Sequence, residues 1–148
     1  MKASSHVEQA VLALLQAYAD AYASRDINRL LELHADDADV VMWGTGGDER
    51  RVGKAEIRMQ AKRDWSQSDS LAMKFGWTSV SARGPVAWVS AELAISWSAG
   101  GRQHSVQARF SGVLEQRDGG WCIVQDHFSL PATEQATGDS FPLQAPTQ

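Results

Sequence analysis

Six side chains of this sequence together have the properties of a small-molecule site, because four are aromatic and two carry an acid–base or cationic group. They are Tyr18, Tyr22, Trp43, Trp65, Arg109 and His127. Ligand pockets are mostly apolar and contain a few convergent polar groups. We therefore expect aromatic walls, a polar floor of Arg109 and His127, and His127 or Tyr18 as the group for any acid–base catalysis. Taken singly, Tyr18, Trp43 and Trp65 also fit positions in a plain core.

Arg109 and His127 each have a second interpretation. Arg109 lies in the apolar run VQARFSGVL of an expected strand. Its guanidinium either faces solvent from the outer side of a sheet or points into a pocket, where it would bind a carboxylate. His127 is either a hydrogen-bonded residue at a strand end or a pocket residue. Because neighbours in a strand point to opposite faces, His127 and Asp126 do not form a pair within their own strand.

The stretch WGTGGDE, residues 43–49, raises the question of a phosphate-binding loop. A dinucleotide fingerprint would need glycine at position 49, where Glu49 stands, and a Walker loop would need serine or threonine at position 55, where alanine stands. The stretch is therefore either a flexible connection between a strand and a helix, or a flap at a pocket mouth. In the second case Trp43 is a wall and Asp48 or Glu49 is the polar rim.

Other kinds of site have little support. The four histidines are scattered and none forms a metal-binding pair at helical spacing, so we expect no metal, and no cofactor motif is present. Neither a nucleophile elbow nor a cysteine–histidine pair is visible. The single cysteine, Cys122, lies in the apolar stretch WCIV, which favours a buried strand residue over a catalytic thiol.

The candidates lie on elements whose periodicity is visible in the sequence. Ser5 and Glu8 form a capping box that predicts a helix start, and an apolar face follows at helical spacing. It comprises Val11, Leu14, Leu15, Tyr18 and Tyr22. Asp26 is suited to cap a second helix, a short strand is expected at residues 40–43, and residues 54–65 predict a third helix.

From about residue 72 the apolar pattern changes to the alternation that is typical of strands. Four long strands are expected, at residues 73–82, 86–98, 104–116 and 121–130, with glycine-bearing hairpin turns between them. Long strands joined by short hairpins form an antiparallel sheet, and helices that precede them pack on one of its faces. The sequence therefore predicts one α+β domain over residues 1–131, followed by a polar tail at 132–148.

Composition and charge narrow the classes of function. The chain has 148 residues and a net charge of −4, without a run of Lys or Arg, which argues against a nucleic-acid partner. No apolar stretch approaches the roughly 20 residues of a membrane-spanning helix, so we expect no membrane partner. The first helix carries acidic residues at helical spacing, unlike a signal peptide. A cytoplasmic protein is the expectation.

The order and spacing of the motifs are similar to those of a known family. The motifs are the paired helices, the strand after ADDA, the glycine loop with its acidic pair, VGKAEI, the third helix and the closing DGGWCIVQDHFSLP at 118–131. Over residues 6–131 they resemble the SnoaL-like branch of the nuclear transport factor two-like superfamily. The resemblance implies three helices in the concave face of a strongly curved, mainly antiparallel sheet, with one internal pocket and a homodimer formed through the sheet.

Activities in this family range from isomerases, cyclases and dehydratases to plain binding modules, so the fold alone does not give the function. Compared with the ketosteroid isomerases of the superfamily, Tyr18 matches their tyrosine. However, Met42 stands where they have an acidic base, and no acid stands near Arg109 and Phe110, where they have a protonated one. We expect a pocket protein that binds an apolar or carboxylate-bearing small molecule, with other acid–base chemistry. The alternative is a non-catalytic homodimeric binding or association module.

Overall fold

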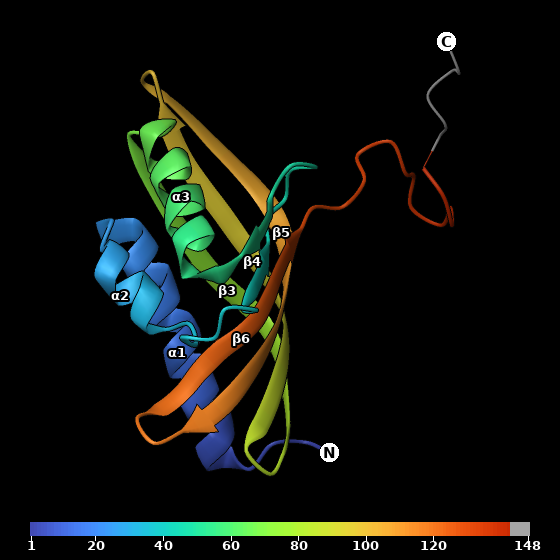
Figure 1. Ribbon diagram of the computed structural model, residues 1–148. Coiled ribbons are helices and arrows are strands. Elements are labelled where there is room, and N and C mark those ends of the chain that lie inside the picture. The colour runs from blue at the N-terminus through green and yellow to red at the C-terminus, as the bar shows by residue number, and fades with distance from the viewer. Residues whose placement is uncertain (143–148) are drawn as a thin grey trace.

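The computed structural model describes residues 1–142, and Figure 1 shows its helices on one side of a curved sheet. Within this range the helices are α1 (Ser5–Ser24), α2 (Ile27–Glu32) and α3 (Gly53–Ser66). The strands are β1 (Val41–Trp43), β2 (Arg50–Val52), β3 (Ser70–Arg83), β4 (Val86–Ala99), β5 (Arg102–Arg117) and β6 (Gly120–Ser129). The predicted α+β arrangement is confirmed.

Short polar side chains cap the starts of α1 and α2, whereas α3 begins after Val52 without a side-chain cap. The cap of α1 is Ser4 and not the predicted Ser5, because the Ser4 hydroxyl accepts a hydrogen bond from the backbone N–H of Val7 at 3.3 Å. Asp26 caps α2 as predicted, accepting from the backbone N–H of Arg29 at 2.9 Å. These caps set the starts of α1 and α2 and therefore which of their side chains face inward.

The strands form one sheet in the order β2-β1-β6-β5-β4-β3, in which every pair is antiparallel except the parallel pair of β1 and β6. The pairing of β5 with β6 contains a bulge, since Val113 pairs with Gln125 but Leu114 pairs with Ile123. The extra residue is Val124. The bulge puts Ile123 on the same buried face as Asp126, although strict alternation would place them on opposite faces.

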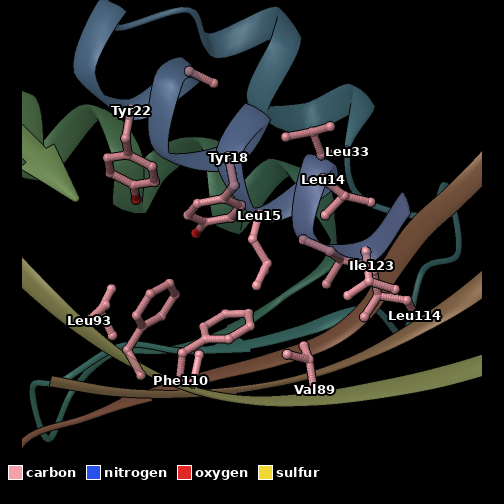
Figure 2. Close-up of a cluster of buried hydrophobic side chains, with 14 of the residues drawn as sticks. Leu14, Leu15, Tyr18, Tyr22, Leu33, Val89, Leu93, Phe110, Leu114 and Ile123 are labelled. Atoms are coloured by element: carbon pink, nitrogen blue, oxygen red, sulfur yellow. The ribbon is translucent and has the colours of Figure 1, made fainter. Parts of the chain in front are cut away.

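The core lies between α1 and the concave face of the sheet. The predicted apolar face of α1 is entirely buried. It packs against strand residues such as Val89, Leu93 and Phe110, as Figure 2 shows. Phe110 makes edge-on contacts with Phe75 and Phe128, with ring centres 5.6 and 5.0 Å apart. This aromatic group joins the outer strand β3 to the central strand β6.

The glycine stretch is the turn of a hairpin between β1 and β2. The sequence pattern did not predict the strand β2. The backbone N–H of Gly44 donates to the carbonyl of Glu49 at 2.9 Å, and the backbone N–H of Gly46 donates to the Glu49 carboxylate at 2.8 Å. A Cβ at Gly44 would overlap that carboxylate. Glycine is therefore needed here so that Glu49 can fold back over its own turn.

After β6 the chain leaves the sheet, as Figure 1 shows for the stretch that leads toward the C-terminus. Residues 132–142 of the expected tail are exposed, and the rest of that tail lies outside the described residues. Within residues 1–142, none of the helices is long and apolar enough to cross a membrane.

Candidate active site

A cavity of about 360 Å³ lies between α1, α3, the β1–β2 turn and the concave face of the sheet. Its apolar walls come from the strands and the segment after β6, and they include Met42, Leu71, Met73, Ile95, Trp97 and Phe128. Its polar groups come from the helices and the turn, and they include Tyr18, Tyr22, Glu49, Gln60 and Asp64. Four of these polar groups, Tyr22, Asp64, Gln60 and Glu49, are joined by hydrogen bonds into one cluster, which is called the polar end below.

Asp64 of α3 is the centre of the polar end. One carboxylate oxygen accepts a hydrogen bond from the Tyr22 hydroxyl at 3.2 Å, and the other accepts from the Gln60 amide at 2.8 Å. Gln60 and Asp64 are four residues apart, so they lie one turn from each other on the same side of α3. The Gln60 amide also donates to Glu49 at 3.1 Å, and its carbonyl oxygen accepts from Arg51 at 2.9 Å. Gln60 is fully engaged and fixes the position of the Asp64 carboxylate.

Burial raises the pKa of the Asp64 carboxyl above its ordinary value of 3.8, because the charged form loses solvation. Hydrogen bonds from Gln60 and Tyr22 oppose this effect but do not cancel it. A carboxylate with a raised pKa is a stronger base than an ordinary one. Asp64 is thus the group of the cavity that is best suited to accept a proton from a bound molecule.

The raised pKa of Asp64 predicts a pH-dependent effect of the substitution Asp64→Asn on stability. Between the unfolded value of 3.8 and the higher folded value, the folded protein holds more protons than the unfolded chain, so Asp64 lowers the free energy of unfolding as pH rises. The variant has no titrating group at this position, so its free energy of unfolding does not fall in this way. Relative to the parent, its stability should therefore increase from about pH 4 upward, until Asp64 of the parent is fully ionised. Urea denaturation at several pH values measures the difference, and a constant difference would contradict the assignment.

Tyr18 and Tyr22 stack on each other on the α1 side of the cavity, with ring centres 5.4 Å apart. Figure 2 shows both rings reaching from α1 toward the sheet. Burial, together with the nearby carboxylates Asp64 and Asp126, raises the pKa of both hydroxyls well above 10.0. Both phenols therefore keep their protons at neutral pH and are able to donate hydrogen bonds to an oxygen atom.

The β1–β2 turn is tied to α3 by ion pairs. Arg63 pairs with Asp48 at 2.7 Å and also with Glu49, while the Glu49 carboxylate lies largely buried at the cavity. These contacts hold the turn across the end of the cavity. Of the two interpretations of the glycine stretch, the flap with Glu49 at the rim agrees with this geometry. Trp43, however, does not form a wall of the cavity below this flap.

The structure does not bring Arg109 and His127 to the cavity with Tyr18. Arg109 alternates with the buried residues Ala108 and Phe110, so its side chain is exposed on the outer face of the sheet. His127 is exposed in the same way, because its neighbours Asp126 and Phe128 point inward. The expectation that Arg109 and His127 form the polar floor of the cavity is therefore wrong. Successive side chains of a strand point to opposite faces, and because Phe110 and Phe128 point inward, Arg109 and His127 point outward.

The expected aromatic walls divide between the two faces of the sheet. Tyr18 and Tyr22 line the cavity. Trp65 lies behind them, with its ring 5.7 Å from that of Tyr22 and its indole N–H donating to the Tyr22 carbonyl at 3.1 Å. Trp43 is 39% exposed and packs against His127 with ring centres 6.1 Å apart, because paired residues of β1 and β6 share a face. The prediction that Trp43 is a wall of the cavity is therefore wrong, because Trp43 lies on the outer face of the sheet.

A buried pair of titratable groups lies beside Tyr18. His34 Nε2 is 3.5 Å from Asp126 Oδ2, both side chains are fully buried, and the ring centres of Tyr18 and His34 are 5.9 Å apart. His34 Nδ1 lies 2.9 Å from the Leu30 carbonyl, which can only accept, so Nδ1 carries a proton. Within residues 1–142, Nε2 and both Asp126 oxygens have no hydrogen-bond partner. His34 Nε2 and Asp126 Oδ2 therefore face each other as a buried pair.

The sequence pattern did not identify Gln60 or Asp64. The predicted buried stripe of α3, marked by Ile57, Ala61 and Trp65, is correct. Gln60 and Asp64 each precede a stripe residue by one position, so they lie on the edge of this stripe. Two polar residues at helical spacing beside an apolar stripe were a signal for this site, although their partner Tyr22 lies 42 residues away in sequence.

Comparison with known proteins gives a family match for the sequence and several matches for the fold. Residues 11–133 match the family described as SnoaL-like domain. No curated protein matches the sequence significantly. A proposed aromatic ring hydroxylase from Novosphingobium aromaticivorans is structurally similar, with a TM-score of 0.80 and 21% identity over 88% of this chain and 93% of that one.

Two further solved structures are similar in the same way. A nuclear transport factor 2-like superfamily protein from Salmonella enterica has a TM-score of 0.81 and 17% identity, over 94% of this chain and all of that one. A proposed dehydratase of the NTF2-like family from Streptomyces avermitilis has a TM-score of 0.77 and 17% identity, over 84% of this chain and 97% of that one. At these identities the similarity shows a shared fold.

Proposed function

The chain belongs to the SnoaL-like domain family, and from this premise we propose that its cavity binds a small, largely apolar molecule and that Asp64 transfers a proton to or from it. The observation that carries the proposal is the position of Asp64. Its carboxylate borders an apolar space and is held by two neutral donors, Tyr22 and Gln60. A fixed base beside an apolar space has the geometry that general base catalysis requires.

The size and chemistry of the cavity support small-molecule binding. Its volume of about 360 Å³ lies within the range of ligand pockets, and the wall that the strands contribute is apolar. A ligand would bury its hydrocarbon part against residues such as Met73 and Trp97 and direct its polar group toward Asp64. This arrangement gives the ligand a single orientation relative to the base.

The arrangement fits reactions in which a proton moves without oxidation, such as isomerisation, cyclisation or dehydration. Asp64 would remove a proton from carbon, and the Tyr18 hydroxyl would donate a hydrogen bond to an oxygen on which charge develops, while the Tyr22 hydroxyl donates to Asp64. One structurally similar protein is itself a proposed dehydratase. The base of this proposal lies on α3, whereas the ketosteroid isomerase pattern places it at the position of Met42.

A substitution that fills the cavity tests the proposal. Met73 lines the cavity, whereas its neighbour Lys74 is exposed on the opposite face of β3. A small-molecule library screened by thermal denaturation should yield compounds that stabilise the parent, by about 2.7 kcal/mol at 100 times the dissociation constant. Met73→Trp should abolish this stabilisation because the indole occupies the space.

The matched control is Lys74→Trp, which adds the same ring on the outer face and should respond to ligand as the parent does. The two variants must first be compared without ligand, so that a loss of folding is not mistaken for a loss of binding. If the compounds stabilise Met73→Trp as strongly as the parent, they bind elsewhere and the cavity is not the site.

The second candidate function is a non-catalytic homodimeric module, and it is favoured by large rings on the outer face of the sheet. Trp88 alternates with the buried residues Ala87 and Val89, so it projects away from the helices, and Trp43 is exposed on the same side as His127. Apolar rings on a sheet face without helices fit a contact with a second copy of the chain.

This candidate predicts a dimer of twice 16.2 kDa in sedimentation experiments. Trp88→Glu should shift the protein toward the monomer, because a carboxylate would have to lose its solvation at the centre of the contact. Met59→Glu, which replaces an exposed apolar residue on α3, is the control and should leave the mass unchanged. A parent protein that sediments as a monomer at all concentrations would remove this candidate.

A further inference from the structure

The charged residues that line the cavity are all acidic, and the cation closest to them, Arg63, is paired with Asp48 and Glu49. Among the lining residues within residues 1–142, the acids Glu49 and Asp64 are present, whereas Lys, Arg and His are absent. Arg109 and His127, which would have favoured a carboxylate ligand, lie on the outer face. A ligand carboxylate would meet two carboxylates here and no cation, so the cavity disfavours anions.

Glu49 and Asp64 differ in whether a positively charged side chain neutralises them. Glu49 is paired with Arg63. None of the ion pairs found in residues 1–142 involves Asp64, whose hydrogen-bond donors, Tyr22 and Gln60, are both neutral. A carboxylate has about four acceptor sites, so Asp64 can accept further hydrogen bonds. A partly buried carboxylate without a cation becomes more favourable when a cation is placed beside it.

Aromatic rings stand close to this carboxylate. The Tyr22 ring belongs to the same hydrogen bond, the Tyr18 ring stacks on it at 5.4 Å, and Trp97 lines the cavity from β4. Ring faces attract cations, most strongly where water is excluded. Other lining residues, such as Leu71 and Ile95, are hydrocarbon and would bury an apolar body.

From this arrangement we propose that the ligand of the cavity is a small organic cation, a protonated amine carried on an apolar ring or short chain, with its ammonium group on Asp64 and its body among the rings. This inference rests on the proposed function, because it names the class of molecule that the same cavity binds. It reverses the expectation of a carboxylate-bearing ligand. The ammonium supplies the positive charge that Asp64 lacks, and the apolar walls exclude a strongly hydrated ion such as sodium.

Three probes of similar size and different charge test the proposal by titration calorimetry. They are phenethylamine, the neutral phenethyl alcohol and the anionic hydrocinnamate. We expect phenethylamine to bind at least about tenfold more tightly than the alcohol and hydrocinnamate to bind most weakly. Asp64→Asn should remove the preference for the amine, whereas Asp69→Asn, which neutralises an exposed acid outside the cavity lining, should retain it.

Proton release gives a second readout that needs no variant. Burial raises the pKa of free Asp64, and an ammonium beside it would lower that pKa again. Binding of phenethylamine at mildly acidic pH should therefore release protons, seen as a binding enthalpy that depends on the ionisation enthalpy of the buffer. Binding of the neutral alcohol should show no such dependence.

The outcomes separate this inference from the proposed function. If the alcohol binds the parent as tightly as the amine and Met73→Trp blocks it, the cation proposal is overturned and the proposed cavity function stands. Tightest binding of hydrocinnamate, or an unchanged amine preference in Asp64→Asn, would also overturn the cation proposal. If none of the three probes binds the parent below about 10 mM, the cation proposal is overturned, and the library screen with Met73→Trp decides the proposed function.

Discussion

Replacing Asp126 by alanine should lower the free energy of unfolding by about 3–5 kcal/mol. The reason is that the pair is shielded from water, since His34 and Asp126 have fully buried side chains and His34 Nε2 lies 3.5 Å from Asp126 Oδ2. In the variant, His34 Nε2 would remain buried beside a small void, without a polar group opposite it. Urea denaturation monitored by tryptophan fluorescence measures the loss, and a change below about 0.5 kcal/mol, as for a surface substitution, would contradict it.

Asp126→Asn is the matched control, because the amide N–H can donate to Nε2 of a neutral imidazole while its volume equals that of the carboxyl group. We expect it to lose no more than about 1.5 kcal/mol, the net worth of one hydrogen bond. A loss equal to that of the alanine variant would show that the charge of Asp126 matters more than its hydrogen bond. The double variant with His34→Ala should be less destabilised than the sum of the single changes, because each residue is costly only when its partner is left alone.

The elements of this fold could be predicted from the sequence because their signals are local. The helical spacing from Val11 to Tyr22 fixes the buried face of α1, and Asp26 marks the start of α2. The four long strands are separated by glycine-bearing turns, which are typical of hairpins. In each case the residues that determine the structure lie within a few positions of one another.

The two faces of the sheet could not be assigned with the same certainty. Alternation places Arg109 and Phe110 on opposite faces, but it does not say which face meets the helices. The large apolar ring of Phe110 decides the matter, and Arg109 therefore points to solvent. The bulge at Val124 adds a change of parity within β6 that no local pattern signals, because it depends on pairing with β5.

The candidate site could be predicted only in part, since its contacts join distant segments. Tyr18 and Tyr22 were expected from their helical face, and Glu49 was one of two alternatives for the rim. Asp64 depends on Tyr22, 42 residues earlier in the chain. Without the packing of α1 against α3, an acid near the end of a charged helix has the same pattern as a surface residue.

Asp64→Asn should slow proton abstraction in the cavity by about 10²–10⁴-fold, which is the usual contribution of a general base. A suitable probe is nitrobenzisoxazole, a flat neutral molecule that opens to a coloured phenolate when a base removes its ring C–H proton and the N–O bond breaks. The parent should accelerate this opening over buffer, because Asp64 borders an apolar cavity and burial raises its pKa. An asparagine of nearly the same shape has no basic oxygen to offer.

The pH profile identifies the base independently of any loss of structure. The rate should increase with pH as Asp64 loses its proton, with a midpoint above 3.8 because its pKa is raised, and then reach a plateau. The exposed-acid variant Asp69→Asn should keep both the rate and the profile of the parent, and Met73→Trp should remove the activity by excluding the probe. An Asp64→Asn protein that retains the rate and profile of the parent would place the base elsewhere, and Asp64 would then serve only to bind the ligand.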